Sequence, residues 1–366
     1  MMMNLSTGFI YLLKWYCIHD ITGWHLESKE QLLVHGTVRS SPMDSEMEMM
    51  RHEKKKGKNE NQIEKKWEDM QYDLLLKIFK GFNQMDLIFI ISRVCQSWRL
   101  VCSDPTLWQT LDLRVLSDYF DVPSRPFAWI DSYSCVRLRI ILRNAFALSN
   151  GSITNLIFHF YVCITSDQLI YVATSCPNLK RLVLPAWHQI SAEGFKTALQ
   201  QWKGLESMIV PRIIAPHPMA MSMMMSIGLF CNNFKELKIM SPFDNEFAIS
   251  IAIFVPKLKV LSLRGSIVYK DALDYILDNM KHLEVLNITH CLIAKGNIVI
   301  GDGPVSVYWH LNDSILAKVS RLREFHACQR DTCSLCQREF FSDGMLTWHA
   351  YEESLLRMDE ISSLAY

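Results

Sequence analysis

An apolar-x-x-apolar-x-apolar pattern recurs six times between residues 156 and 327, mostly at a spacing of 24 to 29 residues. A segment with the apolar spacing of an amphipathic helix precedes the clear copies. The copies begin at Leu179, Leu205, Phe234, Leu258, Leu283 and Leu322. A period of this length predicts a solenoid in which each repeat contributes one short strand and one helix. Solenoids offer an extended concave surface to partners and seldom enclose a catalytic pocket.

The repeat also predicts which side chains are buried. Apolar residues at the repeated strand positions should point into the stack, where neighbouring repeats cover them. The charged residues between them should face the concave side or solvent, and they are Lys180, Glu206, Glu236, Lys238, Lys259 and Glu284. Helices are expected to begin near Ser166 and Asp271, and a first repeat within residues 139–160 should end in a strand at 156–158. The expected fold class is therefore α/β, with parallel leucine-rich strands on the concave face.

The chain before the repeats has a different pattern of apolar and polar residues. Between residues 67 and 113, apolar positions have helical spacing, with Asp73 near the start of a first helix and Gly81 at its end. A second, largely apolar helix is expected at about 84–94, and a third begins near Ser97. The spacing thus predicts a compact three-helix unit, which is small for independent stability.

Three stretches of this unit resemble the F-box family. Residues 70–79 (MQYDLLLKIF) are similar to the family's opening Leu-Pro-x-(Asp/Glu)-Leu-Leu-x-x-Ile-Phe. Residues 94–99 (VCQSWR) and 104–108 (DPTLW) reproduce its Val-Cys-x-x-Trp-Arg and Asp-Pro-x-Leu-Trp. Gln71 stands where the family has proline, so a residue favoured at the start of a helix is missing. The departure predicts a weaker contact between the first turn and the adaptor that F-boxes bind.

Together, the unit and the repeats resemble the plant F-box/leucine-rich-repeat family over about residues 63–366. The resemblance implies a non-catalytic substrate-recognition subunit of an Skp–cullin–F-box ubiquitin ligase. Its partners would be an Skp-family adaptor, a cullin–RING ligase reached through that adaptor, and an unknown protein target held by the solenoid. The residues that the resemblance assigns to adaptor binding are Met70, Leu74, Leu75, Ile78, Phe79, Val94, Cys95, Trp98, Arg99, Leu107 and Trp108.

Composition narrows the class further. Hydrophobic residues make up 49% of the chain and the formal net charge is zero, so charge gives no argument for a nucleic-acid or membrane partner. The apolar run at residues 9–13 is too short to span a bilayer. The odd count of 11 cysteines favours reduced thiols and a cytoplasmic or nuclear protein. No credible catalytic set of Ser/His/Asp or Cys/His residues emerges, so we expect no enzyme activity in the chain itself.

These patterns divide the chain into five segments. Residues 1–62 form a poorly specified extension and a charged linker. The charged run at 51–66, which extends slightly past this boundary, is expected to be solvated. The F-box is predicted at 63–113, a transition segment at 114–138, the leucine-rich-repeat solenoid at 139–330 and a C-terminal cap at 331–366.

The C-terminal segment carries a second chemical signal. Cys333, Cys336 and His349 have the spacing of a two-Cys, two-His zinc finger up to its first histidine. The second histidine is replaced by Glu353, although Cys328 or His326 could complete four ligands. The helix that follows is acidic, whereas a finger that reads DNA needs a basic one. We therefore predict a cap with reduced thiols, no metal and no other cofactor.

Two alternatives from other classes stay open at this stage. One is a zinc-dependent nucleic-acid binder that uses residues 326–353. The other is a leucine-rich-repeat scaffold whose F-box no longer engages the adaptor because of Gln71. A run of methionines, Met219, Met221 and 223–225, is interpreted as packing within a helix core rather than as a metal site.

Overall fold

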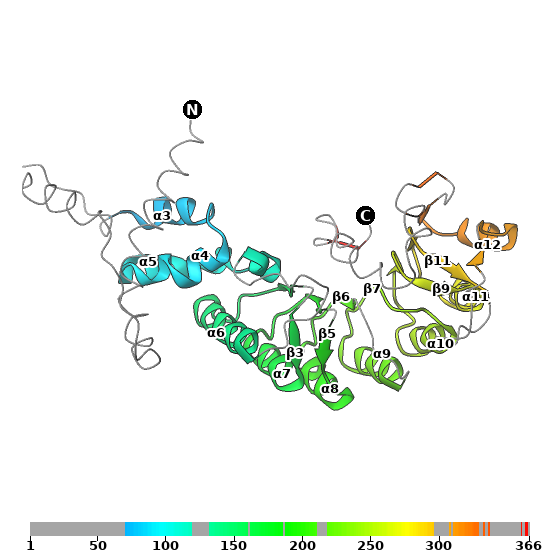
Figure 1. The fold of residues 1–366 in the computed structure, drawn as a ribbon, viewed down its shortest axis with the longest axis horizontal. Helices are drawn as coiled ribbons and strands as arrows, with labels where there is room; N and C mark the ends of the chain where they lie inside the picture. Colours follow the sequence, from blue (N-terminus) through cyan, green and yellow to red (C-terminus); the bar gives the residue numbers. More distant parts are fainter. Residues whose placement is uncertain are drawn as a thin grey trace, which may run out of the picture. The chain divides into compact units, whose positions relative to one another are not determined.

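In the computed structural model, the part of the chain that is described comprises residues 70–118, 132–159, 162–185, 187–210, 218–295, 307–308, 310–328, 332–333, 336, 360 and 363–364. The chain forms two compact units, Met1–Cys102 and Ser103–Tyr366, which are considered separately below (Figure 1). The predicted extension and linker at 1–62 lie outside the described residues. Among those residues, no helix combines the length and the apolar character needed to cross a lipid bilayer.

The first unit contains the predicted helices. They are α3 (Tyr72–Phe79), α4 (Gln84–Phe89), a 3-10 turn at Ile91–Arg93 and α5 (Gln96–Cys102). The Asn83 side chain caps α4 by accepting a hydrogen bond of 2.8 Å from the Asp86 N–H. The core of the unit includes Phe79 and Trp98, whose rings meet edge to face with centroids 5.3 Å apart.

The second unit is built on one eight-stranded sheet in which every neighbouring pair is parallel. The strands, in spatial order, are β1 (Thr110–Asp112), β2 (Asn155–Ile157), β4 (Arg181–Val183), β6 (Ser207–Val210), β7 (Glu236–Ile239), β8 (Val260–Ser262), β10 (Val285–Ile288) and β13 (Glu324–Ala327). Spatial order follows chain order, as expected when each repeat stacks on the one before it.

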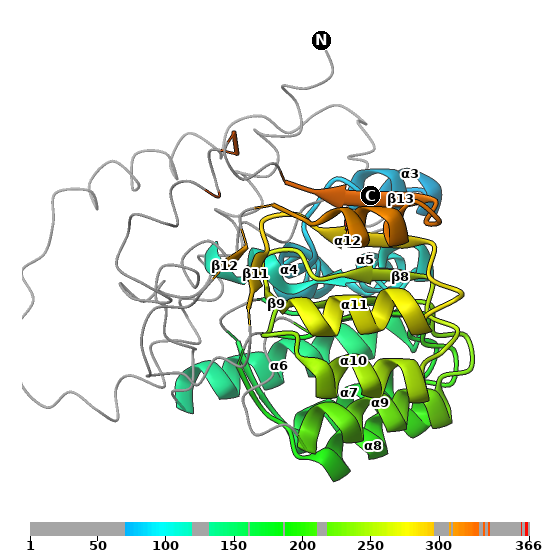
Figure 2. The ribbon, with the colours of Figure 1, turned by 90° about the vertical axis from the view of Figure 1, so that its right-hand side faces the viewer.

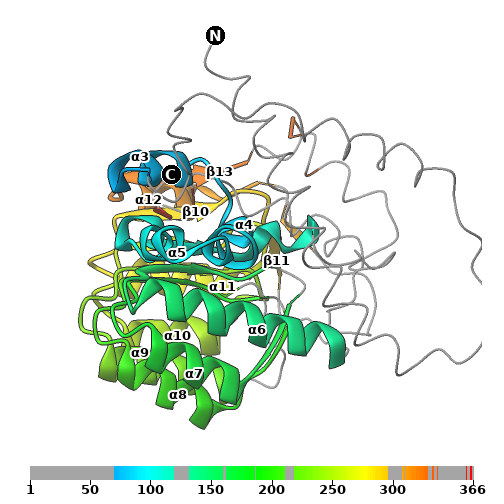
Figure 3. The same ribbon diagram turned by 90° about the vertical axis from the view of Figure 1, so that its left-hand side faces the viewer.

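Helices cover one face of this sheet, the convex side of the solenoid. They are α6 (Ser132–Ser149), α7 (Ser166–Ser175), α8 (Ala192–Gln201), α9 (Pro218–Phe230), α10 (Asn245–Phe254), α11 (Lys270–Asn279) and α12 (Asp313–Val319). Figures 2 and 3 show consecutive helices side by side with their axes aligned, and each packs on the next. Gly228 permits a close approach of α9 to α10, because a Cβ atom there would overlap the Phe254 carbonyl oxygen.

Short strands connect the sheet to the helices. Two of them, β3 (Cys163–Thr165) and β5 (Trp187–Gln189), pair in parallel. A second small sheet contains β9 (Ile267–Tyr269), β11 (Leu292–Ala294) and β12 (Val307–Tyr308). At the far end of each helix a recurring turn leads back to the sheet. In α7, for example, the Leu179 N–H donates to the Cys176 carbonyl at 3.3 Å. Trp202, which occupies the place of Cys176 in the next repeat, donates its indole N–H to that same carbonyl at 3.0 Å.

The structure confirms which strand residues point into the stack of repeats. Leu182, Met208, Leu237, Leu261 and Leu286 are paired in register across the sheet and fully buried. All six predicted copies of the pattern are strands, and the expected first repeat supplies β2.

The sheet begins earlier than the sequence indicated. β1 lies inside the segment 63–113 assigned to the F-box, and its Leu111 pairs with Leu156 of β2. The first helix of the second unit, α6, starts at Ser132, within the predicted transition segment. Strand β1 was missed because it follows no repeat of its own and its residues lie directly after the F-box pattern. The end of the predicted F-box segment therefore forms the first edge of the solenoid sheet.

Candidate adaptor surface, concave face and C-terminal cluster

Several residues that the resemblance assigns to adaptor binding are interior residues. Leu75, Phe79, Trp98 and Trp108 are all buried. Side chains without exposed surface stabilise the helices and turns that carry the motif, and they cannot themselves form a contact surface in this conformation. The motif thus mixes residues that maintain the fold with residues that face outward.

The outward-facing members are Leu74 and Val94, exposed by 49% and 42%, together with Arg99. Met70, Ile78, Cys95 and Leu107 are half-buried. The sequence analysis missed Tyr72, at the start of α3, and Leu100, within α5, which are also large and exposed. Exposed side chains of this kind commonly mark a protein-binding surface when they cluster. The exposure of Leu100 could have been predicted from the sequence, because a residue two positions after Trp98 lies on another side of the helix.

The glutamine that replaces the family's proline does not disturb the start of α3. Gln71 is the residue before the helix, and its backbone has φ −60° and ψ 140°. Proline requires the same φ of about −65°. The Gln71 carbonyl accepts the N–H groups of Leu74 and Leu75 at 3.1 Å. The helix therefore forms as it would with proline.

The middle of the concave sheet face is covered by C-terminal residues. Leu364 lies in an apolar cluster with Ile157, Val183, Ile209, Val260 and Val285, which come from β2, β4, β6, β8 and β10. Its backbone N–H donates to Glu236 at 3.2 Å, and the Ser363 hydroxyl contacts the same carboxylate at 3.2 Å. In Figure 1 the described C-terminal residues, drawn in red, lie on the side of the sheet opposite the helices.

Buried ion pairs accompany this contact. Lys238 of β7 is 0% exposed, and its Nζ lies 2.7 Å from the carboxylate of Glu360, which is itself 1% exposed. Arg264 lies 3.7 Å from the other oxygen of Glu360, and Arg181 pairs with Glu236 at 2.6 Å. Glu236 and Lys238 therefore lie on the concave face, as predicted, but neither of them faces solvent. They are buried beneath the C-terminal residues, where Glu360 compensates the charge of Lys238 and Arg181 of β4 compensates that of Glu236.

The other charged residues of the predicted set behave as expected. Lys180 pairs with Glu206 at 3.6 Å, and Lys259 pairs with Glu284 at 2.8 Å, in both cases at the exposed edge just before the strands. Hydrogen bonding from Lys259 lowers the pKa of Glu284, and hydrogen bonding from Lys235 lowers the pKa of Glu206. These pairs are exposed, so each contributes little to stability.

The helix face of the solenoid exposes apolar side chains on two neighbouring helices. On α9 they are Met221, Met225 and Leu229, and on α10 they are Ile249 and Ile253. The spacing of four residues places each set along one side of its helix. The methionine run is thus only partly a core feature, because Met223 and Met224 are buried whereas Met221 and Met225 are exposed.

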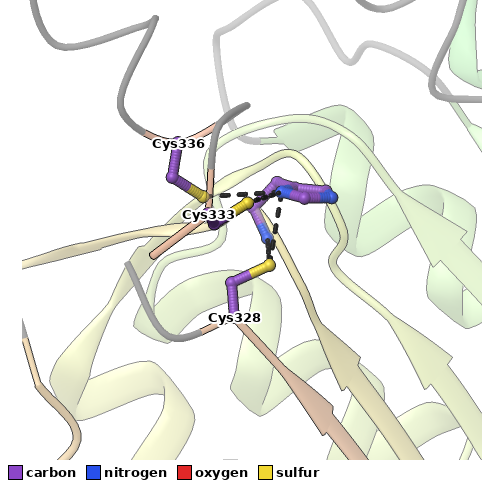
Figure 4. Close-up of side chains that lie close together, drawn as sticks. Cys328, Cys333 and Cys336 are labelled. Carbon is purple, nitrogen blue, oxygen red and sulfur yellow. Dashed lines mark hydrogen bonds between the residues drawn. The ribbon is translucent and has the colours of Figure 1, made fainter. Parts of the chain in front are cut away.

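The C-terminal cysteines lie together at the last repeats. Sulfur atoms of Cys328, Cys333 and Cys336 lie 3.3, 3.5 and 3.4 Å from Nδ1 of His290 (Figure 4). The four ligand atoms all lie within 4.8 Å of one another. His349, the histidine weighed in the sequence analysis, lies outside the described residues, as do the cap residues between Cys336 and Glu360.

Burial controls the protonation of this group. Burial lowers the pKa of His290 below its usual value, and the nearby Arg264 guanidinium lowers it further. Burial also raises the pKa of the Cys328 and Cys336 thiols. In a metal-free group, burial therefore favours a neutral His290 imidazole and protonated Cys328 and Cys336 thiols.

His290 was the residue that sequence reasoning missed. The register of the repeats could have indicated it, since β10 pairs with β13 up to Ile288 and Ala327. Thr289 and Cys328 are the next residues after this pair, so the repeat alignment alone places His290 next to Cys328.

Comparison with known proteins agrees with this architecture. The F-box-like domain family matches residues 72–114. The Arabidopsis thaliana F-box/LRR-repeat protein At3g48880 is 39% identical over 302 residues, which cover 82% of this chain and 96% of that protein. The chain belongs to the plant F-box/LRR-repeat family.

More distant relatives extend the same similarity. The putative F-box protein At4g11580 of Arabidopsis thaliana is 26% identical over 341 residues, covering 82% of this chain and 96% of that protein. The F-box protein SKIP19 from the same plant is 28% identical over 258 residues, covering 68% of this chain and 78% of that protein. F-box/LRR proteins are typically non-catalytic, and F-box domains generally bind Skp-family adaptors.

Proposed function

We propose that this F-box/LRR protein is the substrate-recognition subunit of an Skp–cullin–F-box ubiquitin ligase, acting in the cytoplasm or nucleus. The observation that carries the proposal is the order of its parts: an F-box-like stretch at 72–114 leads directly into an eight-stranded leucine-rich-repeat sheet. In this role the F-box binds the adaptor, and the solenoid holds a target protein. The chain then acts by raising the effective concentration of target lysines near the ubiquitin-carrying enzyme, and it supplies no catalytic group.

The exposed surfaces support this division of labour. Leu74 and Val94 expose apolar area on the F-box helices, where the adaptor would bind. On the solenoid, the exposed apolar side chains of α9 and α10 favour contact with a protein target, because exposed apolar patches commonly mark protein interfaces. The middle of the concave face is less accessible, since Leu364 and Glu360 cover it.

Replacing Leu74 by Asp should weaken adaptor binding by about 30-fold or more, measured by titration calorimetry with a purified Skp-family adaptor. Removal of an apolar anchor from an interface centre costs about 2 kcal/mol or more, and Leu74 is exposed in the free chain, so the fold does not depend on it. The melting temperature should stay close to that of the wild type.

Leu316 of α12 provides the matched control, because it is a solenoid leucine with a similar exposure of 45%. Leu316→Asp should bind the adaptor like the wild type. Trp98→Ala is unsuitable as a probe, since Trp98 is a core residue and its truncation would lower stability. If Leu74→Asp and Leu316→Asp both retain wild-type affinity, the proposed adaptor surface is wrong.

A further inference from the structure

We propose that His290, Cys328, Cys333 and Cys336 bind a structural zinc ion. The sequence analysis predicted no metal and considered His349 as the only nearby histidine with finger-like spacing. The structure supplies a different histidine, from a turn 38 residues before Cys328. With His290 the set has four ligands of the Cys₃His type, which is one of the common compositions of structural zinc sites.

The geometry suits zinc. With Zn–S bonds of about 2.3 Å and Zn–N bonds of about 2.0 Å at tetrahedral angles, a nitrogen and a sulfur ligand lie about 3.5 Å apart. The three observed distances from Nδ1 of His290 to the sulfurs are 3.3, 3.5 and 3.4 Å. Figure 4 shows the three cysteine side chains converging on one ring nitrogen. The same side chains could not all form good hydrogen bonds with that nitrogen, because it has a single proton or lone pair to share.

Different segments bring these ligands together. His290 lies between β10 and β11 with a left-handed backbone, φ 57°, a conformation that costs free energy in residues other than glycine. Cys328 follows β13 directly, and it accepts the His290 backbone N–H at 3.4 Å. Cys333 and Cys336 follow shortly after Cys328 in the chain, and their Cys-x-x-Cys spacing is typical of two ligands of one zinc ion.

The charges of such a site are reasonable at this position. Three thiols release their protons to solvent as they bind, and the resulting zinc complex carries one negative charge. The Arg264 guanidinium lies close enough to influence His290, and it would offset that charge. A bound ion would also explain why three thiols gather around one half-buried imidazole.

The role of the ion would be structural. The site joins the turn after β10 to the chain that follows β13, and β13 is the last strand of the sheet in the described residues. An end repeat lacks a following repeat to cover it and needs a capping device. Zinc binding contributes to folding where the site is absent from the unfolded chain. The proposed ion would therefore stabilise this end of the solenoid, independently of the ligase role.

Zinc content of the purified full chain tests the proposal. Elemental analysis should find roughly one zinc per chain in the wild type. His290→Ala and Cys336→Ser should each lose most of it, whereas Cys135→Ser, which changes a half-buried cysteine of α6, should keep it. His349→Ala should also keep it. Zinc lost in His349→Ala but kept in His290→Ala would overturn the proposed ligand set in favour of the finger spacing.

A second measurement uses only the wild-type chain, so it does not depend on variants that fold. Alkylation with and without a chelator, read by mass spectrometry, should show Cys328, Cys333 and Cys336 protected until zinc is removed. Cys95, half-buried in the F-box, should react equally in both conditions. Absence of zinc together with unchanged reactivity of the three thiols would contradict the proposal.

Discussion

Leu261→Asp should lower the free energy of unfolding by at least about 4 kcal/mol, as expected when an unpaired charge enters a core. Leu261 is the central residue of β8 and is 0% exposed. It pairs in register with Leu237 on one side and Leu286 on the other. Because each repeat is stabilised by its neighbours, the damage should spread to the adjacent repeats. Hydrogen exchange should therefore speed up in β7 and β10 as well as in β8.

Lys259→Ala is the matched control for this variant. Lys259 lies two residues earlier, is exposed, and pairs with Glu284 at 2.8 Å. Its loss should leave the melting temperature within about 2 °C of the wild type, because surface substitutions have small effects. Equal shifts for the two variants in thermal melts followed by circular dichroism would mean that the strand phase is wrong.

Lys238→Ala should be the second strongly destabilising change. Lys238 and Glu360 form a fully buried pair at 2.7 Å. Removing one partner of a buried pair typically costs about 3–5 kcal/mol, and Glu360 would keep only its longer contact of 3.7 Å with Arg264. The loss of stability is smaller if the C-terminal residues leave the sheet, because Glu360 is then solvated. Destabilisation of the unit and release of the C-terminal residues should each make the C-terminus more susceptible to carboxypeptidase. We expect to detect the cleavage by mass spectrometry.

Two further variants make this test specific. Lys235→Ala removes an exposed lysine just before the same strand, where it pairs with Glu206, and should change neither stability nor cleavage. The double variant Lys238→Met and Glu360→Leu should recover part of the lost stability, since apolar residues of similar size can replace a buried ion pair, while Arg264 loses its contact with Glu360. A double variant as unstable as Lys238→Ala would contradict the expectation that apolar side chains can replace this pair.

Local patterns were sufficient to predict most of the fold. The spacing of Leu258, Leu261 and Leu263 gave the strand, its buried face and its place in the stack, because the solenoid repeats the same contacts. The helix starts predicted near Ser166 and Asp271 correspond to α7 and α11, and α7 is capped by Thr165 in a box with Gln168. β1 lacked a preceding repeat and was therefore not predicted.

The sites were less predictable because they depend on contacts that are distant in sequence. Glu360 and Lys238 are in contact although 122 residues separate them in sequence, and no local pattern near either residue predicts the pair. His290 meets the cysteines in the same way, from a turn that the repeat alignment fixes but the finger spacing does not. In the F-box, the motif identified Leu74 and Trp98 equally well, yet only the three-dimensional structure separates the exposed residue from the buried one.

The most direct test of the proposed function is assembly of the wild-type chain with its ligase partners. The purified full chain would be mixed with an Skp-family adaptor and a cullin–RING ligase, and analysed by size-exclusion chromatography with light scattering. The account predicts one complex containing one copy of each component at concentrations on the order of 10 µM. A folded chain that elutes alone under these conditions would contradict the central claim and would favour a scaffold whose F-box does not engage the adaptor.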